Sequence, residues 1–170
     1  MNVGRGKRFF RTPAGIRCMD EGMPRRHFTV VEINRMIPEL EVIFTEVIQL
    51  HAGMRRAEVR LSQLGCSATR EVLSGEDDGG SPELRMAKGM LRGFYEALVD
   101  GLGRVADLGG EVKDLEVGVV DFPGRRGSEE ICLCWKLGEK RLGHWHTGAS
   151  GWAGRRPIDH LVPLEPSPLD

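Results

Sequence analysis

The chain has 170 residues, of which 40% are hydrophobic and 29% are charged, a balance typical of one globular domain with a real core. It contains no run of about 18 uninterrupted apolar residues, which argues against a membrane-spanning protein. The formal net charge of -1 hides an asymmetry. Residues 1–26 carry seven basic against two acidic side chains, near +5, so the remainder is near -6 by subtraction.

Residues 1–26 are interpreted as a disordered basic extension, because they are rich in Gly and Arg and poor in periodic apolar residues. They lack the apolar segment of a signal peptide, and Met23 is an alternative start to Met1. The acidic body repels phosphates, so nucleic-acid binding is not expected beyond this arm. Four cysteines at irregular spacing, Cys18, Cys66, Cys132 and Cys134, fit reduced thiols. We therefore expect a cytoplasmic protein with no membrane partner.

A long amphipathic helix is predicted to begin near Val30. Thr29 and Glu32 have the spacing of a capping box, in which each side chain accepts a hydrogen bond from a free backbone N–H. Apolar residues then recur every three or four positions until Gly65. Pro38 removes an amide donor, so we expect a kink there or a short lead-in helix.

A second helix is predicted after a flexible connector over residues 66–80. Ser81 supplies an N-cap and Pro82 the first helical position, and paired glycines at 109 and 110 end the helix. Glycines at 89, 93, 101 and 103 weaken this helix unless they permit close packing against the first.

Three strands are predicted in the last third of the chain, over residues 115–122, 130–137 and 141–146. In the second, Ile131, Leu133, Trp135 and Leu137 share one face, which should lie on the helices. We therefore predict an α+β fold, a long antiparallel helical hairpin packed on a small three-stranded antiparallel β-meander. The domain should span residues 27–158, followed by an extended tail over 159–170.

The sequence also resembles a family of prokaryotic proteins, the domain of unknown function 2203. The resemblance rests on FTVVEINRMIPEL at Phe28–Leu40, then VKDLEVGVVDFP, LCWKLGE, the pair Trp145 and His146, and GWAGRRP at Gly151–Pro157. Several ordered motifs at compatible spacing are more specific than any single one. The resemblance covers about residues 28 to 158 and implies the family's fold, but no activity.

One constellation has the residue types of a zinc site. Two thiols on one strand and two imidazoles on the next suit tetrahedral zinc, and the residues are Cys132, Cys134, His144 and His146. A three-residue connection over 138–140 would pair Cys134 with His144 and Cys132 with His146. A connection one residue shorter or longer would turn both imidazoles to the other face. Ordinary packing of small thiols in the sheet is the alternative.

A second constellation has the residue types of a ligand site: two carboxylates, an imidazole and a guanidinium beside aromatic walls. The polar residues are Asp121, Glu139, His146 and Arg155, and the walls are Trp135, Trp145 and Trp152. The alternative is structural: Arg155 pairs with Asp121 or Glu139 as a brace for the glycine-rich loop, and His146 bonds a backbone carbonyl.

Two functional hypotheses follow. The first is a binding or interaction module built on the helical hairpin, with a small polar ligand on the sheet and a homodimer formed through the helices. The second is a small metal-assisted or acid–base enzyme, hydrolase-like, that uses His146 with Asp121 or Glu139.

Overall fold

The computed structural model describes residues 26–160, which form three α-helices and a five-stranded antiparallel sheet, so the predicted α+β class is confirmed. The helices are α1 (Val30–Gln63), α2 (Arg70–Ser74) and α3 (Pro82–Asp107). The strands are β1 (Glu111–Asp114), β2 (Val119–Arg126), β3 (Glu129–Lys136), β4 (His144–His146) and β5 (Arg156–Pro157). Nearly all of the predicted basic extension, and the predicted tail from residue 161, lie outside the described residues.

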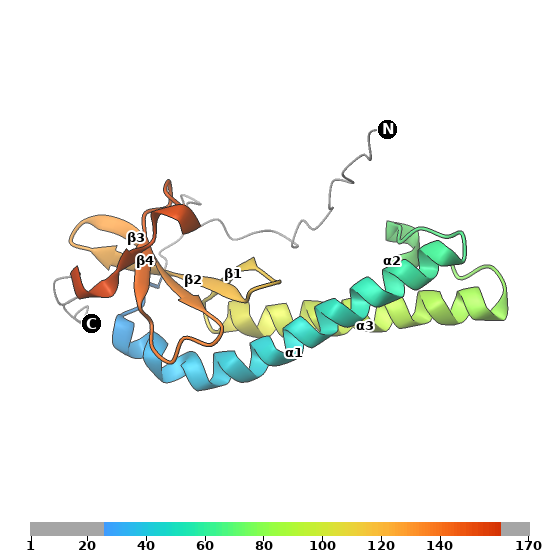
Figure 1. Ribbon diagram of the computed structural model, residues 1–170, viewed down its shortest axis with the longest axis horizontal. Helices are drawn as coiled ribbons and strands as arrows, with labels where there is room; N and C mark the ends of the chain where they lie inside the picture. Colours follow the sequence, from blue (N-terminus) through green and yellow to red (C-terminus); the bar gives the residue numbers. More distant parts are fainter. Residues whose placement is uncertain (1–25, 161–170) are drawn as a thin grey trace.

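The long helices begin at the predicted capping residues. The Thr29 side chain accepts a hydrogen bond from the backbone N–H of Glu32, and the Glu32 carboxylate accepts one from the backbone N–H of Thr29 at 2.7 Å. Ser81 caps α3 with its side chain. Pro38 lies inside α1 and does not divide it, so there is no separate lead-in helix. Instead, the axis of α1 bends in its N-terminal part (Figure 1).

The two long helices form an antiparallel hairpin, and the sheet covers only one half of it (Figure 1). The covered half contains the start of α1 and the end of α3. The far end of the hairpin projects away from the sheet and carries α2 (Figure 1), and we define residues 57–92 as the distal arm. The sheet and the distal arm therefore lie at opposite ends of an elongated molecule.

The connector over residues 66–80 contains a helix that was not predicted, α2. Thr69 caps it by accepting a hydrogen bond from the backbone N–H of Val72, whose side chain is fully buried. Lys88 of α3 is also buried, and its ammonium group donates to Asp77 at 2.7 Å and to the carbonyl of Gly79 at 3.0 Å. The connector is thus packed onto α3. Its polar composition gave no indication of this packing.

The sheet order follows the chain, β1-β2-β3-β4-β5, and has two strands more than the predicted meander. The first predicted strand, over residues 115–122, begins only at Val119, because residues 115–118 form a turn. In that turn an Asp114 oxygen accepts from the backbone N–H of Glu116 at 2.7 Å, and Gly118 adopts a φ of 69°. The residues before the turn form β1.

The last predicted strand, over residues 141–146, is shorter than expected. It forms only at His144–His146, because the backbone N–H of Leu142 donates to the Asn34 side chain of α1 at 2.7 Å. The register is nevertheless the one that a three-residue connection would give: Cys132 lies opposite His146, and Cys134 opposite His144. Strand β5, which was also not predicted, pairs with the outer side of β4.

The core lies between the helices and one face of the sheet. The ring of Phe44 from α1 packs edge-on against Trp135 with centroids 6.0 Å apart, and Phe28 packs against Phe122 in the same way at 5.5 Å. The helix-facing side of β3 is the predicted one. Because side chains alternate along strands, Asp121, Cys132, Cys134 and His146 lie on the opposite face.

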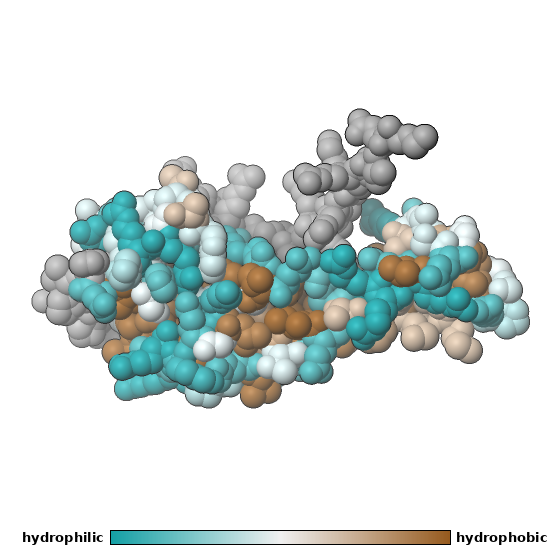
Figure 2. Space-filling model, viewed as in Figure 1, coloured by the Kyte–Doolittle hydropathy of each residue, from teal (hydrophilic) through white to brown (hydrophobic). Residues whose placement is uncertain are grey.

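Several apolar residues of the helical hairpin are exposed, and Figure 2 shows apolar patches among polar side chains on the face that it presents. On the two long helices they are Val31, Val42, Val59, Met86 and Met90. The homodimer expected through the helices stays a prediction. In the described part of the chain, none of the helices has the length and apolar character needed to span a bilayer.

Candidate functional site

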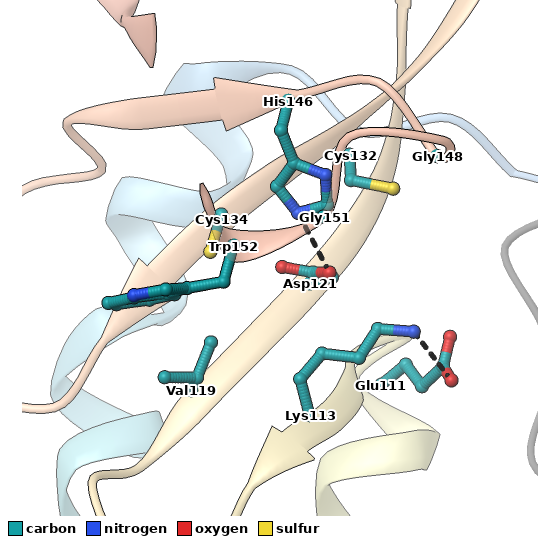
Figure 3. A pocket seen from close by; sticks show the side chains of 10 residues that line it. All are labelled: Glu111, Lys113, Val119, Asp121, Cys132, Cys134, His146, Gly148, Gly151 and Trp152. Atoms are coloured by element: carbon teal, nitrogen blue, oxygen red, sulfur yellow. Dashed lines mark hydrogen bonds and ion pairs between the residues drawn. The ribbon is translucent and has the colours of Figure 1, made fainter. Parts of the chain in front are cut away.

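A cavity of about 380 Å³ lies against the sheet face that turns away from the helices. Its floor consists of buried side chains of β2, β3 and β4, and its rim comes from β1 and from the loop between β4 and β5 (Figure 3). The residues that line it are Glu111, Lys113, Val119, Asp121, Cys132, Cys134, His146, Gly148, Gly151 and Trp152. This volume is at the small end of the range of ligand sites in proteins.

The floor centres on a buried pair formed by Asp121 of β2 and His146 of β4. Both are nearly inaccessible, with 2% and 4% of their surface exposed. His146 Nε2 lies 3.0 Å from Asp121 Oδ2, and His146 Nδ1 lies 2.9 Å from the carbonyl oxygen of Thr147. A carbonyl oxygen only accepts hydrogen bonds, so Nδ1 carries a proton. The Nε2 atom is thereby directed at the carboxylate.

Cys134 of β3 stands beside this pair, because Asp121 is its cross-strand neighbour. The thiol sulfur, an Asp121 oxygen and a His146 nitrogen all lie within 4.8 Å of one another, and all three residues are buried. Burial, and secondly the Asp121 charge, raise the pKa of the Cys134 thiol, so it is protonated at neutral pH. In the described residues this is the group of side chains that could hold a metal ion.

Arg155 braces the loop between β4 and β5 against the sheet. Its Nη2 donates to the carbonyl oxygen of Cys134 at 3.1 Å and to the two Glu139 oxygens at 3.2 and 3.3 Å. Its guanidinium also lies over the Trp152 ring, 4.2 Å from the ring centre. Arg155 thus fixes the aromatic residue at the rim. Of the two carboxylates considered as partners for Arg155, Asp121 and Glu139, the one it contacts is Glu139. Arg155 and Glu139 do not line the cavity.

The four residues predicted to bind zinc share one face of the sheet but do not form one cluster. Cys134 and His146 are joined by Asp121, while the Cys132 sulfur points away from Asp121 (Figure 3). His144 Nδ1 lies 3.6 Å from a Glu139 oxygen and takes no part in lining the cavity. Asp121 lies opposite Cys134 across β2 and β3, and this pairing places Asp121, rather than Cys132 or His144, next to Cys134 and His146. That register was not predicted.

Only one of the three predicted aromatic walls lies at the cavity. Trp152 forms part of the rim and is 49% exposed. Trp135 and Trp145 are buried in the core on the helix-facing side, where the Trp135 indole N–H donates to the carbonyl oxygen of Glu139 at 2.8 Å. These two residues do not form walls of the cavity, because neighbouring side chains of a strand point to opposite faces of the sheet. Trp135 is next to Cys134 and Trp145 is next to His146, and both of those neighbours are on the cavity face.

Two charged residues at the rim were missed because β1 was not predicted. Glu111 and Lys113 form an ion pair at 2.7 Å that faces the floor across the cavity (Figure 3). The signal was present in the alternation of Glu111, Val112 and Lys113 after two glycines. Glycines at 148 and 151 complete the lining.

The helical hairpin, the five-stranded meander on one of its ends and the cavity on the outer face of that meander place the chain among α+β proteins with a sheet-borne pocket. The chain belongs to the family described as an uncharacterized conserved protein (DUF2203), whose model matches residues 26–158. The predicted resemblance is thereby confirmed. Comparisons with curated proteins and with solved structures give no significant match.

Proposed function

We propose that this protein is a binding module for a small polar molecule, which it takes up in the cavity on the outer face of its sheet. The observation that carries the proposal is the placement of a buried carboxylate–imidazole pair on the floor of a cavity of about 380 Å³. Burying two ionisable groups costs free energy that apolar residues would not require. A ligand that donates a hydrogen bond to Asp121 Oδ1, which has no hydrogen-bond donor among the described residues, gives that burial a use.

The charges around the cavity indicate the character of the ligand. Asp121 and His146 form one pair on the floor, and Glu111 and Lys113 form a second at the rim. Each pair joins an acidic to a basic group, so the lining has no large excess of either sign. A ligand with both donors and acceptors fits this lining better than a multiply charged anion, and Trp152 offers an apolar surface for its carbon skeleton.

Binding is favoured over acid–base catalysis by the hydrogen bonds of His146. A general base needs a ring nitrogen within reach of the substrate proton. Here Nδ1 donates to the carbonyl of Thr147 and Nε2 contacts Asp121, so both nitrogens are directed at the protein. Glu139, the other carboxylate considered for this chemistry, is paired with Arg155 outside the cavity.

The proposal can be tested by NMR on the full chain labelled with ¹⁵N. The three indole N–H signals serve as reporters, because Trp152 lies at the rim while Trp135 and Trp145 lie in the core. The probes are millimolar mixtures of amino acids, monosaccharides, nucleosides and dicarboxylic acids. We expect at least one probe to shift the Trp152 signal and leave the other two nearly unchanged.

The matched control uses the two histidines of β4. Replacing His146 with Ala removes the side chain that positions the Asp121 carboxylate, so it should weaken binding of the active probe by about tenfold or more, or roughly 1.4 kcal/mol. Replacing His144 with Ala should leave binding intact, because His144 does not line the cavity. If no probe moves the Trp152 signal, or if the two variants weaken binding equally, the proposal is wrong.

A further inference from the structure

We propose that Asp121, Cys134 and His146 form a mononuclear zinc site on the floor of the cavity. The three donor atoms lie within 4.8 Å of one another, and each comes from a different strand of the sheet. A sulfur, a nitrogen and a carboxylate oxygen are a donor set that zinc accepts, whereas Ca²⁺ and Mg²⁺ prefer oxygen donors alone. The inference goes beyond the proposed function, because an ion can bind here without an organic ligand.

The orientation of His146 is that of a metal ligand. Its Nδ1 donates to the Thr147 carbonyl at 2.9 Å, which fixes the ring and leaves Nε2 as the atom turned toward the cluster. Histidines that bind metals nearly always donate their other ring N–H in this way, to a backbone carbonyl or a carboxylate. The proton between Nε2 and Asp121 Oδ2, whose separation is 3.0 Å, occupies the place of the ion.

The second oxygen of Asp121 supplies an independent observation. Oδ1 is buried and accepts no hydrogen bond from the described residues, in a side chain that is only 3% exposed. A buried carboxylate oxygen without a donor is unfavourable by about 1 to 3 kcal/mol, and more when the group is charged. Coordination of a cation through both oxygens of this carboxylate would remove that penalty.

The spacing of the donors requires little movement to accept the ion. With zinc bonds of about 2.0 to 2.3 Å, donors in a tetrahedral site lie roughly 3 to 4 Å apart. Nε2 and Oδ2 already have this separation. The Cys134 sulfur lies within 4.8 Å of the other two donor atoms, so a shift of the thiol by about 1 Å would bring it into range.

The charges balance when zinc binds. Bonds form from zinc to sulfur, nitrogen and oxygen, and two protons are released to solvent: the thiol proton of Cys134 and the proton shared by Asp121 and His146. A thiolate, a carboxylate and a neutral imidazole then surround a dication, so the buried site carries no net charge. Three protein ligands leave a fourth position, and it opens into the cavity because all three ligands line it.

The test uses the full chain without a histidine tag, treated with chelator and then titrated with Co²⁺ alone. We expect one equivalent to bind and to give a sulfur-to-cobalt charge-transfer band together with the intense visible bands of a four-coordinate ion. Zinc should then displace the cobalt and remove these bands. Replacing Cys134 with Ser should abolish the charge-transfer band and weaken zinc binding by about 100-fold or more.

The control is Cys132→Ser, a change of the same type in the same strand, which should leave the band and the affinity unchanged. Asp121→Asn keeps the sulfur, so it should retain the band while weakening the affinity, which guards against a Cys134 variant that fails to fold. The inference is overturned if cobalt does not bind, if it binds without a sulfur band, or if Cys132→Ser removes the band and Cys134→Ser does not.

Discussion

The hydrogen bonds of His146 determine how many protons the buried pair holds. Because Nδ1 donates to a carbonyl oxygen, a single further proton lies between Nε2 and Asp121. That proton gives either an ion pair or two neutral groups, and both states have zero net charge. A neutral total limits the cost of burying the pair, whereas removing one partner would leave an uncompensated polar group. The pair is therefore tolerated in the floor of the cavity only as a unit.

A second buried charge, the ammonium group of Lys88, allows a pH-dependent prediction. Its partner is Asp77, and the hydrogen bond from Lys88 holds the pKa of Asp77 below its ordinary value. A lowered pKa in the folded state stabilises the protein above the pKa of the unfolded state, near 4, and this stabilisation disappears as the pH falls through the folded value. We expect Asp77→Asn to lower the urea midpoint at pH 7 and to have little effect in strong acid.

Asp78→Asn is the matched control for this prediction. Asp78 bonds Arg92 at 2.5 Å, but the Arg92 side chain is 22% exposed, whereas that of Lys88 is 3% exposed. Water can replace the lost partner of Arg92 more readily than that of Lys88. The control should therefore lower the midpoint less than Asp77→Asn at pH 7. An equal loss for Asp77→Asn at neutral and acid pH would refute the electrostatic explanation.

The site was predictable at the level of residue types, and less so at the level of partners. Asp121 and His146 were both expected at a site, as was a role for Arg155 as a brace. The choice of partners depends on which residues face each other across β2 and β3, and that register is set by the connection at residues 127–128, where Gly127 has a φ of 59°. Local patterns along one strand do not contain this information.

At the scale of elements, the close approach of α1 and α3 leads to a prediction about two glycines of α3. A Cβ atom on Gly101 would lie 2.8 Å from a methyl group of Val47, a stiff and fully buried side chain. A Cβ atom on Gly93 would meet nothing within 4 Å. Both Gly→Ala changes gain up to about 1 kcal/mol of helix propensity. At Gly101 this gain is opposed by overpacking, which destabilises a protein by about 1 to 3 kcal/mol.

We therefore expect Gly93→Ala to raise the free energy of unfolding by up to about 1 kcal/mol. Gly101→Ala should be less stable than Gly93→Ala by about 1 to 3 kcal/mol. Urea unfolding followed by circular dichroism measures both, and the difference isolates packing because the propensity gain is shared. Equal stabilisation of the two variants would mean that the helices can separate at Gly101 without loss.

The elements that could be predicted are those with strong local signals. The capping box at Thr29 and the Ser81–Pro82 start placed both long helices, because a cap satisfies backbone groups of its own segment. The short strands β1 and β5 were missed: the alternation in β1 covers only four residues, too few to stand out, and β5 has two residues, one of them a proline. α2 was missed for the same reason: its five residues lie in a polar connector and are held by contacts with α3.

At the scale of the whole molecule, the two ends of the hairpin pack against different elements. At the sheet end, side chains of α1 and α3 are covered by β-strands, and the cavity lies on the outer side of this layer. In the distal arm the helices contact each other and the short helix α2 (Figure 1). Regions with fewer buried apolar contacts open at lower free energy than the rest of a protein. The distal arm should therefore open independently of the sheet.

This independence predicts different patterns of hydrogen exchange for two Val→Ala changes. Val72 of α2 and Val105 of α3 are both fully buried, the first in the distal arm and the second near the sheet. Each change removes two methyl groups and should cost about 2 kcal/mol. In native-state hydrogen exchange, Val72→Ala should lower protection only in residues 57–92, and zinc and ligand binding should be unchanged. Val105→Ala should also lower protection in β2 and β3. Equal losses in the sheet for both variants would show that the molecule opens as one unit.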